Sequence, residues 1–386
     1  MDRRQFIRVA GGGVILAAGA AATGCSAAMP AEAIAPWQGP AAQADLRRWI
    51  LGYAILAPHS HNLQSWLVDL SVPDRIVLRC DLQRLLPETD PYSRQIMMSH
   101  GTFIELLDIA ARERGQRTEV TLFPEGAFGP DKPDTRPVAS IRLVADAAVP
   151  KDPLFAQILK RHTNRAAYDP ARAVPASAWQ AMAEAVKPHP LRFGFAGPDQ
   201  PDLMGQQRAV AAEAWRIEMV TPRTIMESYK VLRVGPEEVA RHRDGLTLLD
   251  PTVVWMARLG LFDRSRAPGP DDYATTSQIK DFGKKLESTP GFLWMVSEAN
   301  DRVTQVNAGR AYVRVQLAGT AQGVVMQPLQ QALQEYPEQS AAHAQIRRLL
   351  GVAAPAQTLQ MWARVGFAPS VGPAPRRGVD AHIVRT

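Results

Sequence analysis

The chain has 386 residues, of which 46% are hydrophobic and 21% are charged, a composition typical of a globular protein rather than a mainly disordered one. The formal net charge is +6, and residues 1–25 account for +2 of it because Arg3, Arg4 and Arg8 stand there against Asp2 alone. The other basic residues are spread along the chain without a nucleic-acid motif, so no nucleic acid is expected as a partner.

The first 28 residues, "MDRRQFIRVAGGGVILAAGAAATGCSAA", have the pattern of an export signal: a basic start, an apolar Gly/Ala-rich stretch and then small residues. The stretch is too short and too weakly apolar to be a good permanent membrane span. "DRRQFIR" resembles the twin-arginine (Tat) signal. We therefore expect the Tat machinery as a partner, a periplasmic or cell-envelope location, and a signal and linker over 1–35. Tat substrates leave the cytoplasm folded, often around a cofactor.

The chain contains two cysteines, Cys25 and Cys80. "ATGC" at 22–25 is an alternative signal for a lipid anchor at Cys25, although Ala22 is a poor substitute for the usual leucine. If Cys25 is cleaved off or lipidated, no intrachain disulfide is possible. Cys80 lies in a strand predicted over 76–82 by an alternating apolar series, Ile76, Leu78, Cys80 and Leu82. A packed thiol is the expected role.

Further elements follow from apolar spacing. Residues 43–57 have helical periodicity that Pro58 ends, so the polar stretch "HSHNLQSW" at 59–66 is expected in a loop after a helix. A helix is predicted at 100–114, then two strands at "TEVTLF" and "VASIRLVAD". "DAAVPKDP" near 146–153 predicts a break. It divides the chain into a first half, 36–150, and a second half, 151–386.

The two halves share one local pattern. "HGTFIELLDIAARERGQ" at 100–116 and "AGRAYVRVQLAGTAQGV" at 308–324 both run from glycine through thirteen residues to a second glycine. A distant tandem duplication and two ordinary buried helices that end at a glycine both explain this pattern. Residues from about 198 to 272 have no counterpart in the first half, so we expect them to form an inserted helical cover.

Three more polar stretches carry candidate chemistry. In "KRHTNRAAYD", an extended backbone would place Arg161, Thr163 and Arg165 on one side, where they suit a phosphate monoester. Basic residues that simply close a helix are the plainer interpretation. "GVVMQPLQQAL" at 323–333 is a strand-like run that ends at Gln327–Pro328, and "VGFAPSVGPAPRRGVD" at 365–380 is a loop that carries Arg376 and Arg377.

In this order, the four stretches resemble the nitroreductase-like flavoproteins, and most closely their Acg-type, Tat-exported, FMN-binding branch. "APHSHNLQSW" is similar to the family's Pro-Ser-x-Asn-x-Gln-Pro-Trp loop, although Ser65 replaces its proline and His59 stands where a serine is common. "RHTNR" resembles its phosphate motif, "GTAQGVVMQPL" its buried helix and flavin-contacting loop, and "GFAP…PRRGVD" its C-terminal basic loop.

The resemblance implies a role for each of these residues. Asn62 and Gln64, with Ser65 beside them, would meet the pyrimidine edge of the flavin. The FMN phosphate would lie against Arg161, Thr163 and Arg165, with Arg376 or Arg377 completing the clamp. The stretch along the flavin's central ring would be Gln327, Pro328, Leu329 and Gln330. Metal binding by His59 and His61 is the alternative for the first loop, but no third ligand is apparent nearby.

The resemblance also implies an α+β fold. Two tandem nitroreductase-like halves would form a pseudo-dimer of antiparallel-rich sheets surrounded by helices, with an inserted helical cover. Each motif occurs once, so we expect a monomer with one flavin site.

The expected activity is reduction of a small electron acceptor, such as a nitroaromatic or a quinone, through reduced flavin. No catalytic side chain and no metal are predicted. One alternative is a protein that sequesters or carries FMN with little turnover. Another is a flavin-free periplasmic solute-binding protein with two α/β lobes.

Overall fold

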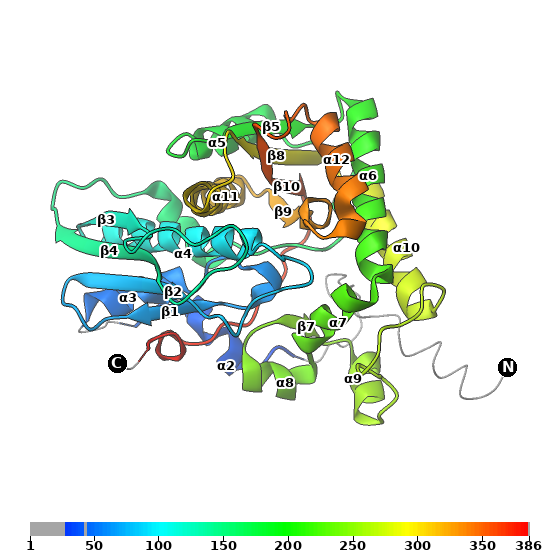
Figure 1. Cartoon of the computed structure of the whole chain (residues 1–386), viewed down its shortest axis with the longest axis horizontal. Coiled ribbons are helices and arrows are strands. Elements are labelled where there is room, and N and C mark those ends of the chain that lie inside the picture. The colour runs from blue at the N-terminus through cyan, green and yellow to red at the C-terminus, as the bar shows by residue number, and fades with distance from the viewer. Residues whose placement is uncertain (1–27, 42–44, 385–386) are drawn as a thin grey trace.

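The computed structural model describes residues 28–41 and 45–384 (Figure 1). The predicted signal sequence and the alternative lipid anchor at Cys25 lie outside the described residues. Within the described ranges, no helix is long and apolar enough to cross a membrane.

Two four-stranded antiparallel sheets form the frame of the protein. The first has the order β1-β2-β4-β3, with β1 Trp66–Asp69, β2 Arg75–Cys80, β3 Gln116–Leu122 and β4 Pro137–Ala145. The second has the order β5-β8-β10-β9, with β5 Arg192–Ala196, β8 Gly291–Ser297, β9 Val325–Pro328 and β10 Thr358–Gly366. Taken in chain order within each half, the strands are therefore arranged in the same way.

The helices repeat in the same order. A helix precedes the first strand of each sheet, α3 Leu46–Ala54 and α5 Ala176–Val186, and a longer helix follows the second strand, α4 Arg94–Glu113 and α11 Arg302–Ala321. This arrangement is compatible with a tandem pseudo-dimer. The predicted α+β fold with antiparallel sheets and surrounding helices is confirmed.

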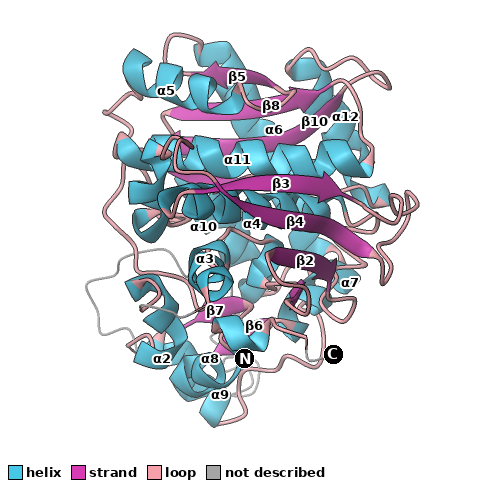
Figure 2. Cartoon of the chain, turned by 90° about the vertical axis from the view of Figure 1, so that its left-hand side faces the viewer, coloured by secondary structure: helices cyan, strands magenta, loops and turns pink. Residues whose placement is uncertain are grey.

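The long helices α4 and α11 pack against each other between the two sheets (Figure 2). The core around the first sheet includes Val306, Val313 and Leu317 of α11, whereas Met98 of α4 joins the core around the second sheet. Gly101 and Gly309 permit this contact. A Cβ atom on Gly101 would lie 1.8 Å from the Val306 carbonyl oxygen, and one on Gly309 would lie 1.8 Å from that of Met98.

Some predicted boundaries were wrong. The strand predicted over 76–82 ends at Cys80, and Leu82 is 38% exposed. The helix predicted from residue 100 begins at Arg94, because the Asp90 carboxylate accepts hydrogen bonds from the backbone N–H groups of Gln95 (3.2 Å) and Ile96 (2.9 Å) and caps the first turn.

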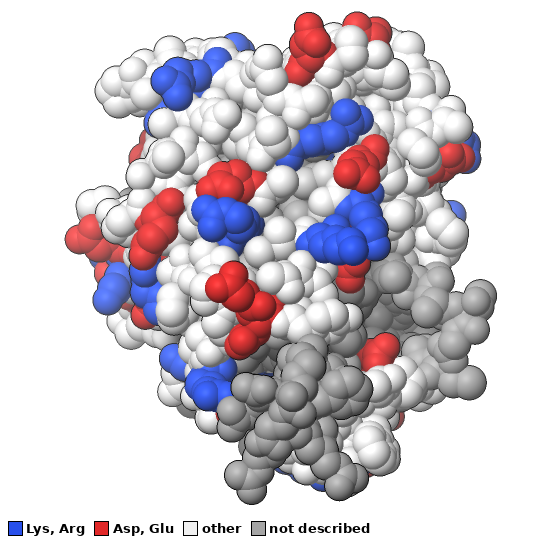
Figure 3. Space-filling view, turned by 90° about the vertical axis from the view of Figure 1, so that its right-hand side faces the viewer, with Lys and Arg blue, Asp and Glu red and all other residues white. Residues whose placement is uncertain are grey.

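The helical cover lies between β5 and β8, where the first half has only a short turn between β1 and β2. It contains α6 Pro201–Val220, α7 Pro222–Lys230, β6 Leu232–Val234, α8 Gly235–His242, β7 Leu246–Leu248, α9 Pro251–Arg258 and α10 Tyr273–Glu287, so it extends beyond the predicted 198–272. Positive and negative side chains are interspersed on the visible face (Figure 3). The remaining short elements are α2 Ala31–Ile34, η1 Ala35–Gln38, η2 Ser60–Asn62, η3 Pro153–Lys160, η4 Gln330–Leu333, η5 Pro337–Gln339, α12 Ser340–Leu349 and η6 Val379–Ala381.

The cover shares its hydrophobic core with the second sheet. Trp215, Met219 and Tyr229 are buried in a cluster that also contains Phe292 and Trp362 of the sheet, and Met226 packs against it. The indole N–H of Trp362 also donates to the Gln207 side chain of α6 (2.8 Å). The apolar residues of the cover are therefore a core-facing stripe, and removing the cover would expose the sheet.

A buried carboxylate fastens the cover to the first half. Glu227 of α7 accepts hydrogen bonds from the backbone N–H groups of Glu88 and Thr89, each at 2.9 Å, and from the Thr89 hydroxyl at 2.6 Å. Since the cover joins the second sheet through its core, this contact links both halves through the cover.

Candidate functional site

The loop at 59–66 has an unusual backbone. His61, Asn62 and Gln64 adopt positive φ angles of 48°, 56° and 54°, a left-handed conformation that non-glycine residues rarely take. Such strain persists only where surrounding contacts enforce it, and it clusters at functional sites. The loop is therefore held in one defined shape.

His59 and Ser65 hold the loop from inside. The Nδ1 atom of His59 lies 2.7 Å from the Ser60 carbonyl oxygen, so we assign its proton there. Nε2 then accepts from the backbone N–H of Ser65 (3.1 Å) and the Ser65 hydroxyl (2.7 Å). Burial lowers the pKa of His59 well below 6.5, which keeps the ring neutral.

These contacts bear on two predictions for the loop. Ser65 is fully buried and bonds to His59, so it positions the loop, and its contact with a cofactor stays a prediction. Both His59 ring nitrogens have protein partners, which removes them as free metal ligands. Within the part of the chain that the structure describes, no group of three or more His, Cys, Asp or Glu residues is arranged to hold a metal ion.

The amides of Asn62 and Gln64 join the loop to the C-terminal segment and to the cover. Asn62 donates to the carbonyls of Pro375 (3.1 Å) and Gly245 (3.3 Å), and its oxygen accepts from Arg376 (2.5 Å). Gln64 donates to the Arg243 carbonyl (2.9 Å) and accepts from the backbone N–H of Arg377 (2.9 Å). Both amides thus bond to protein groups, and their contact with a flavin edge stays a prediction.

Two buried arginines meet beside this loop. Arg161 donates to the Leu56 carbonyl (2.9 Å) and to the Gln316 side chain (3.0 Å). Arg376 donates to the carbonyls of Leu56 (3.3 Å) and Ala57 (3.0 Å). The Trp37 ring lies 5.5 Å from the Arg161 guanidinium and 5.2 Å from that of Arg376. Residues from four distant parts of the chain are thereby brought together.

The two guanidinium groups carry charge that no acid offsets. Among the described residues, no carboxylate forms an ion pair with Arg161 or Arg376, and the Nε atom of each is buried without a hydrogen-bond partner. Burial lowers the pKa of Arg161 to about 10. The pKa of Arg376 falls well below 12.5 because of burial and then because of the nearby Arg161 charge. An anion bound here would offset the free-energy cost of burying these two unpaired charges.

The phosphate-motif residues differ in burial, and their shared contact with one phosphate stays a prediction. Arg161 is buried, Thr163 is half-buried and pairs with Met326 of β9, and the Arg165 side chain is exposed. The chain between Arg161 and Arg165 is therefore not one regular strand. Arg376 is a close neighbour of Arg161, because both donate to the Leu56 carbonyl, and Arg377 lies beside Gln64.

A second cationic group lies near Arg165. Arg364 of β10 is fully buried and donates to the Gln327 side chain (2.8 Å) and the Ala166 carbonyl (2.8 Å). Burial, reinforced by Arg364 and Arg165, lowers the pKa of Lys285 to about 8. Lys285 belongs to α10 of the cover, so the cover contributes positive charge beside the phosphate motif.

The third predicted stretch is only partly accessible. Leu329 is 2% exposed and its side chain packs in the core of the cover, and contact of this residue with a ligand stays a prediction. The Gln327 side chain is held by Arg364, while Pro328 and Gln330 are half-buried. The stretch lies beside the phosphate motif because the Met326 carbonyl accepts from the backbone N–H of Asn164 (3.1 Å).

Several residues of the Arg161–Arg376 cluster were not predicted from the sequence. Trp37 and the carbonyls of Leu56 and Ala57 leave no pattern in the sequence that marks them. Tyr312 and Gln316 do leave one, because they are polar residues four apart on a buried helix. The Tyr312 hydroxyl is buried without a hydrogen-bond partner, and burial raises its pKa.

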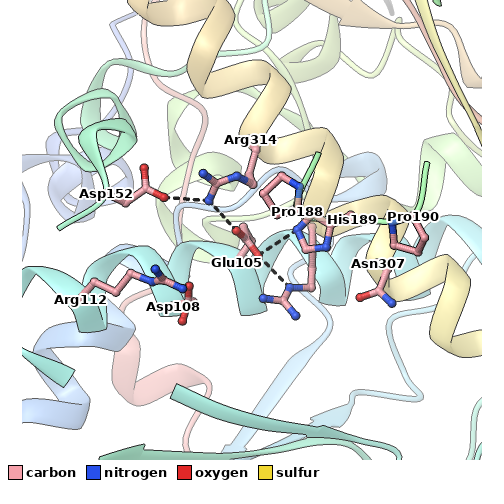
Figure 4. Close-up of a pocket in the computed structure, with 10 residues that line it drawn as sticks. Glu105, Asp108, Arg112, Asp152, Pro188, His189, Pro190, Asn307 and Arg314 are labelled. Atoms are coloured by element: carbon pink, nitrogen blue, oxygen red, sulfur yellow. Dashed lines mark hydrogen bonds and ion pairs between the residues drawn. The ribbon is translucent and has the colours of Figure 1, made fainter. Parts of the chain in front are cut away.

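A cavity of about 480 Å³ elsewhere in the structure is chemically different (Figure 4). It lies between α4 and α11, beside the loop that carries His189. Glu105 accepts from Arg310 and Arg314, each at 2.8 Å, and Arg314 also pairs with Asp152 at 2.8 Å. The charges there compensate one another, so this cavity lacks the unpaired positive charge of the Arg161 cluster.

Comparisons with known proteins agree with the family resemblance. No family model matches the chain. Over 364 residues, the chain is 26% identical to proteins from two strains of Mycobacterium tuberculosis, H37Rv and CDC 1551/Oshkosh, each named "Putative NAD(P)H nitroreductase". The alignments cover 88% of this chain and 93% of each relative. The resemblance to nitroreductase-like proteins is thus confirmed, whereas the Tat-exported branch stays a prediction.

Solved structures align with part of the chain. An FMN-dependent nitroreductase from Mycobacterium smegmatis in complex with NADPH covers 59% of this chain and 95% of its own, with 17% identity and a TM-score of 0.37. A nitroreductase-like family protein from Bacillus cereus covers 61% and 97%, with 10% identity and a TM-score of 0.35.

Proposed function

We propose that this chain binds FMN at the Arg161–Arg376 cluster and acts as an oxidoreductase of the nitroreductase type. The observation that carries the proposal is the pair of buried guanidinium groups with unpartnered Nε atoms and no acid partner among the described residues. Uncompensated buried charge is costly, and a phosphate dianion would offset it with charge-assisted hydrogen bonds. The similarity to proteins named as nitroreductases supports FMN as the source of that phosphate.

The proposed contacts divide between the phosphate and the ring system of FMN. Arg161, Thr163 and Arg376 would hold the phosphate, and Arg165 would meet the ligand from the exposed side of the same segment. Asn62, Gln64 and the stretch Gln327, Pro328 and Gln330 would border the ring system. When bound, FMN supplies the two-electron redox chemistry, and the protein positions it and limits access. An absorption spectrum of the purified protein tests the proposal, because a spectrum without flavin, even after incubation with FMN, would refute it.

We propose a small nitroaromatic- or quinone-like electron acceptor as the substrate, and we assign no catalytic side chain. The alternative is a protein that sequesters or carries FMN. A specific observation favours this alternative: the cover bonds directly to the loop, since the Asn62 carbonyl accepts from the backbone N–H of Gly245 (3.1 Å). A cover that seals the site would slow turnover.

The rate at which a quinone oxidises photoreduced flavin separates the two functions. The cover cannot simply be deleted, because it shares its core with the second sheet. Replacing Glu227 by Ala instead loosens the cover by removing its hydrogen bonds to Glu88 and Thr89, while the Arg223–Glu88 ion pair remains. Glu213→Ala on the exposed side of α6 is a matched control. If the cover is a gate, Glu227→Ala should speed oxidation roughly tenfold.

Stopped-flow absorbance gives three distinguishable results. Fast oxidation in the unmodified protein that Glu227→Ala leaves unchanged supports an enzyme without a gate. Slow oxidation that only Glu227→Ala accelerates supports a gated site. Slow oxidation in all three proteins would contradict the oxidoreductase proposal and favour sequestration.

We propose that the chain is exported by the twin-arginine route to the periplasm or cell envelope and works as a monomer. The motif "DRRQFIR" before a Gly/Ala-rich stretch supports export. Replacing Arg3 and Arg4 together by Lys should leave most of the protein in the cytoplasmic fraction. Full export of that variant, measured by fractionation and immunoblotting, would contradict the assignment.

A further inference from the structure

The outer face of α9 is apolar and uncovered. Trp255 is 62% exposed, Leu259 is 53% exposed, and Leu261, just after the helix, is 36% exposed. Trp255 and Leu259 are four residues apart and so share one face of the helix. The opposite side packs Val253 and Met256 into the core of the cover. Large apolar side chains clustered in this way mark an interaction surface.

This surface lies at the end of the molecule where the described chain begins. The helix α2 contacts α8, and both views place α2, α8 and α9 together at one end (Figures 1 and 2). The first described residue, Ala28, is three positions after Cys25 and six after the apolar stretch that ends near residue 22. Any membrane attachment of the N-terminal segment would therefore hold the α9 end close to the bilayer.

The charges around the surface are balanced. Arg258 of α9 pairs with Glu237 at 2.7 Å, and Arg264 pairs with Glu238 at 2.7 Å. A balanced rim offers little attraction to an anionic partner, whereas exposed Trp and Leu side chains suit the boundary between lipid headgroups and acyl chains.

We propose that the α9 face, formed by Trp255, Leu259 and Leu261, docks on the surface of a phospholipid bilayer. The interaction rests on apolar insertion and should persist at high salt, unlike one that depends on charge. It involves no residue of the proposed flavin site, so it stands or fails separately from that function.

Tryptophan fluorescence provides a selective test. All eight tryptophans lie in the described ranges, and Trp255, at 62%, is the only one with a largely exposed side chain. Vesicles of phosphatidylcholine and phosphatidylglycerol with brominated acyl chains should quench Trp255 in the full-length protein, and Trp255→Phe should abolish that quenching. Replacing Leu259 and Leu261 together by Ser should raise the lipid concentration needed for half-maximal quenching at least about tenfold. Trp255 remains in this variant, so its fluorescence still reports binding. Val72→Ser, which removes an exposed apolar side chain from the turn between β1 and β2, is the control and should change nothing.

If something other than lipid covers the α9 face, the quenching experiment gives a different result. Loss of quenching at high salt would contradict apolar docking. No quenching at any lipid concentration, with Trp255 already shielded from aqueous acrylamide, would show that the N-terminal segment covers the face. Shielding that grows with protein concentration would show a second copy there, and either result would overturn the proposal.

Discussion

Replacing Arg161 by Ala should weaken FMN binding by about 1.5–3 kcal/mol, or roughly 10- to 150-fold in Kd, the range for a charge-assisted hydrogen bond. Arg161 is buried, has an unpartnered Nε and lies beside Arg376 without an acid. Titrating FMN into the apoprotein while following flavin fluorescence measures the change. Lys160→Ala, an exposed basic neighbour, should bind FMN normally.

Thermal unfolding with and without FMN distinguishes a phosphate clamp from a structural arginine. Removing a buried cation that lacks an acid partner relieves a desolvation penalty, although Gln316 loses its partner. The apoprotein should therefore change little, while most of the stabilisation by FMN is lost. An equal loss of stability with and without FMN, repeated in Arg161→Gln, would show that Arg161 serves the fold and not the ligand.

The sequence indicated which stretches form this cluster, but not the pairs within it. Arg161 and Arg165 were expected to share one phosphate because an extended chain places alternate residues on one side. The structure adds Arg376, which donates to the same Leu56 carbonyl as Arg161. Such a pairing joins residues more than two hundred positions apart, and only the packing of the C-terminal segment against the 56–64 loop determines it.

The fold could be predicted from the sequence more fully than the site, for a physical reason. Apolar periodicity and glycine positions are local signals, so helices, strands and the matching glycines of the two halves can be found in sequence. The acceptors of Arg161 and Arg376 are backbone carbonyls of Leu56 and Ala57, which every residue type offers. Trp37 likewise gains its role only through tertiary contact. Local patterns cannot identify groups of this kind.

Replacing Gly309 by Ala should destabilise the protein by about 4 kcal/mol or more, a large effect for one methyl group. The added Cβ would lie 1.8 Å from the Met98 carbonyl oxygen and 2.6 Å from its carbonyl carbon. Backbone cannot rotate away as a side chain can, so α11 must move off α4. Both sheets pack on this helix pair, and the displacement would loosen both cores. Urea unfolding followed by circular dichroism measures the loss.

Three further variants test whether the helix contact itself is responsible. Gly319→Ala, on the same helix, meets the flexible end of Met326 at 3.0 Å and should cost far less. Gly205→Ala has open space around it on α6 and should stabilise the protein by about 0.5–1 kcal/mol.

Gly101→Ala should destabilise the protein as much as Gly309→Ala, because its Cβ would clash with the Val306 carbonyl from the other side of the helix contact. The double variant should cost little more than either single one, since the first substitution already separates the helices. Additive losses would show that the two glycines act at independent places, and a mild effect of Gly309→Ala would show that α4 and α11 are not in such close contact.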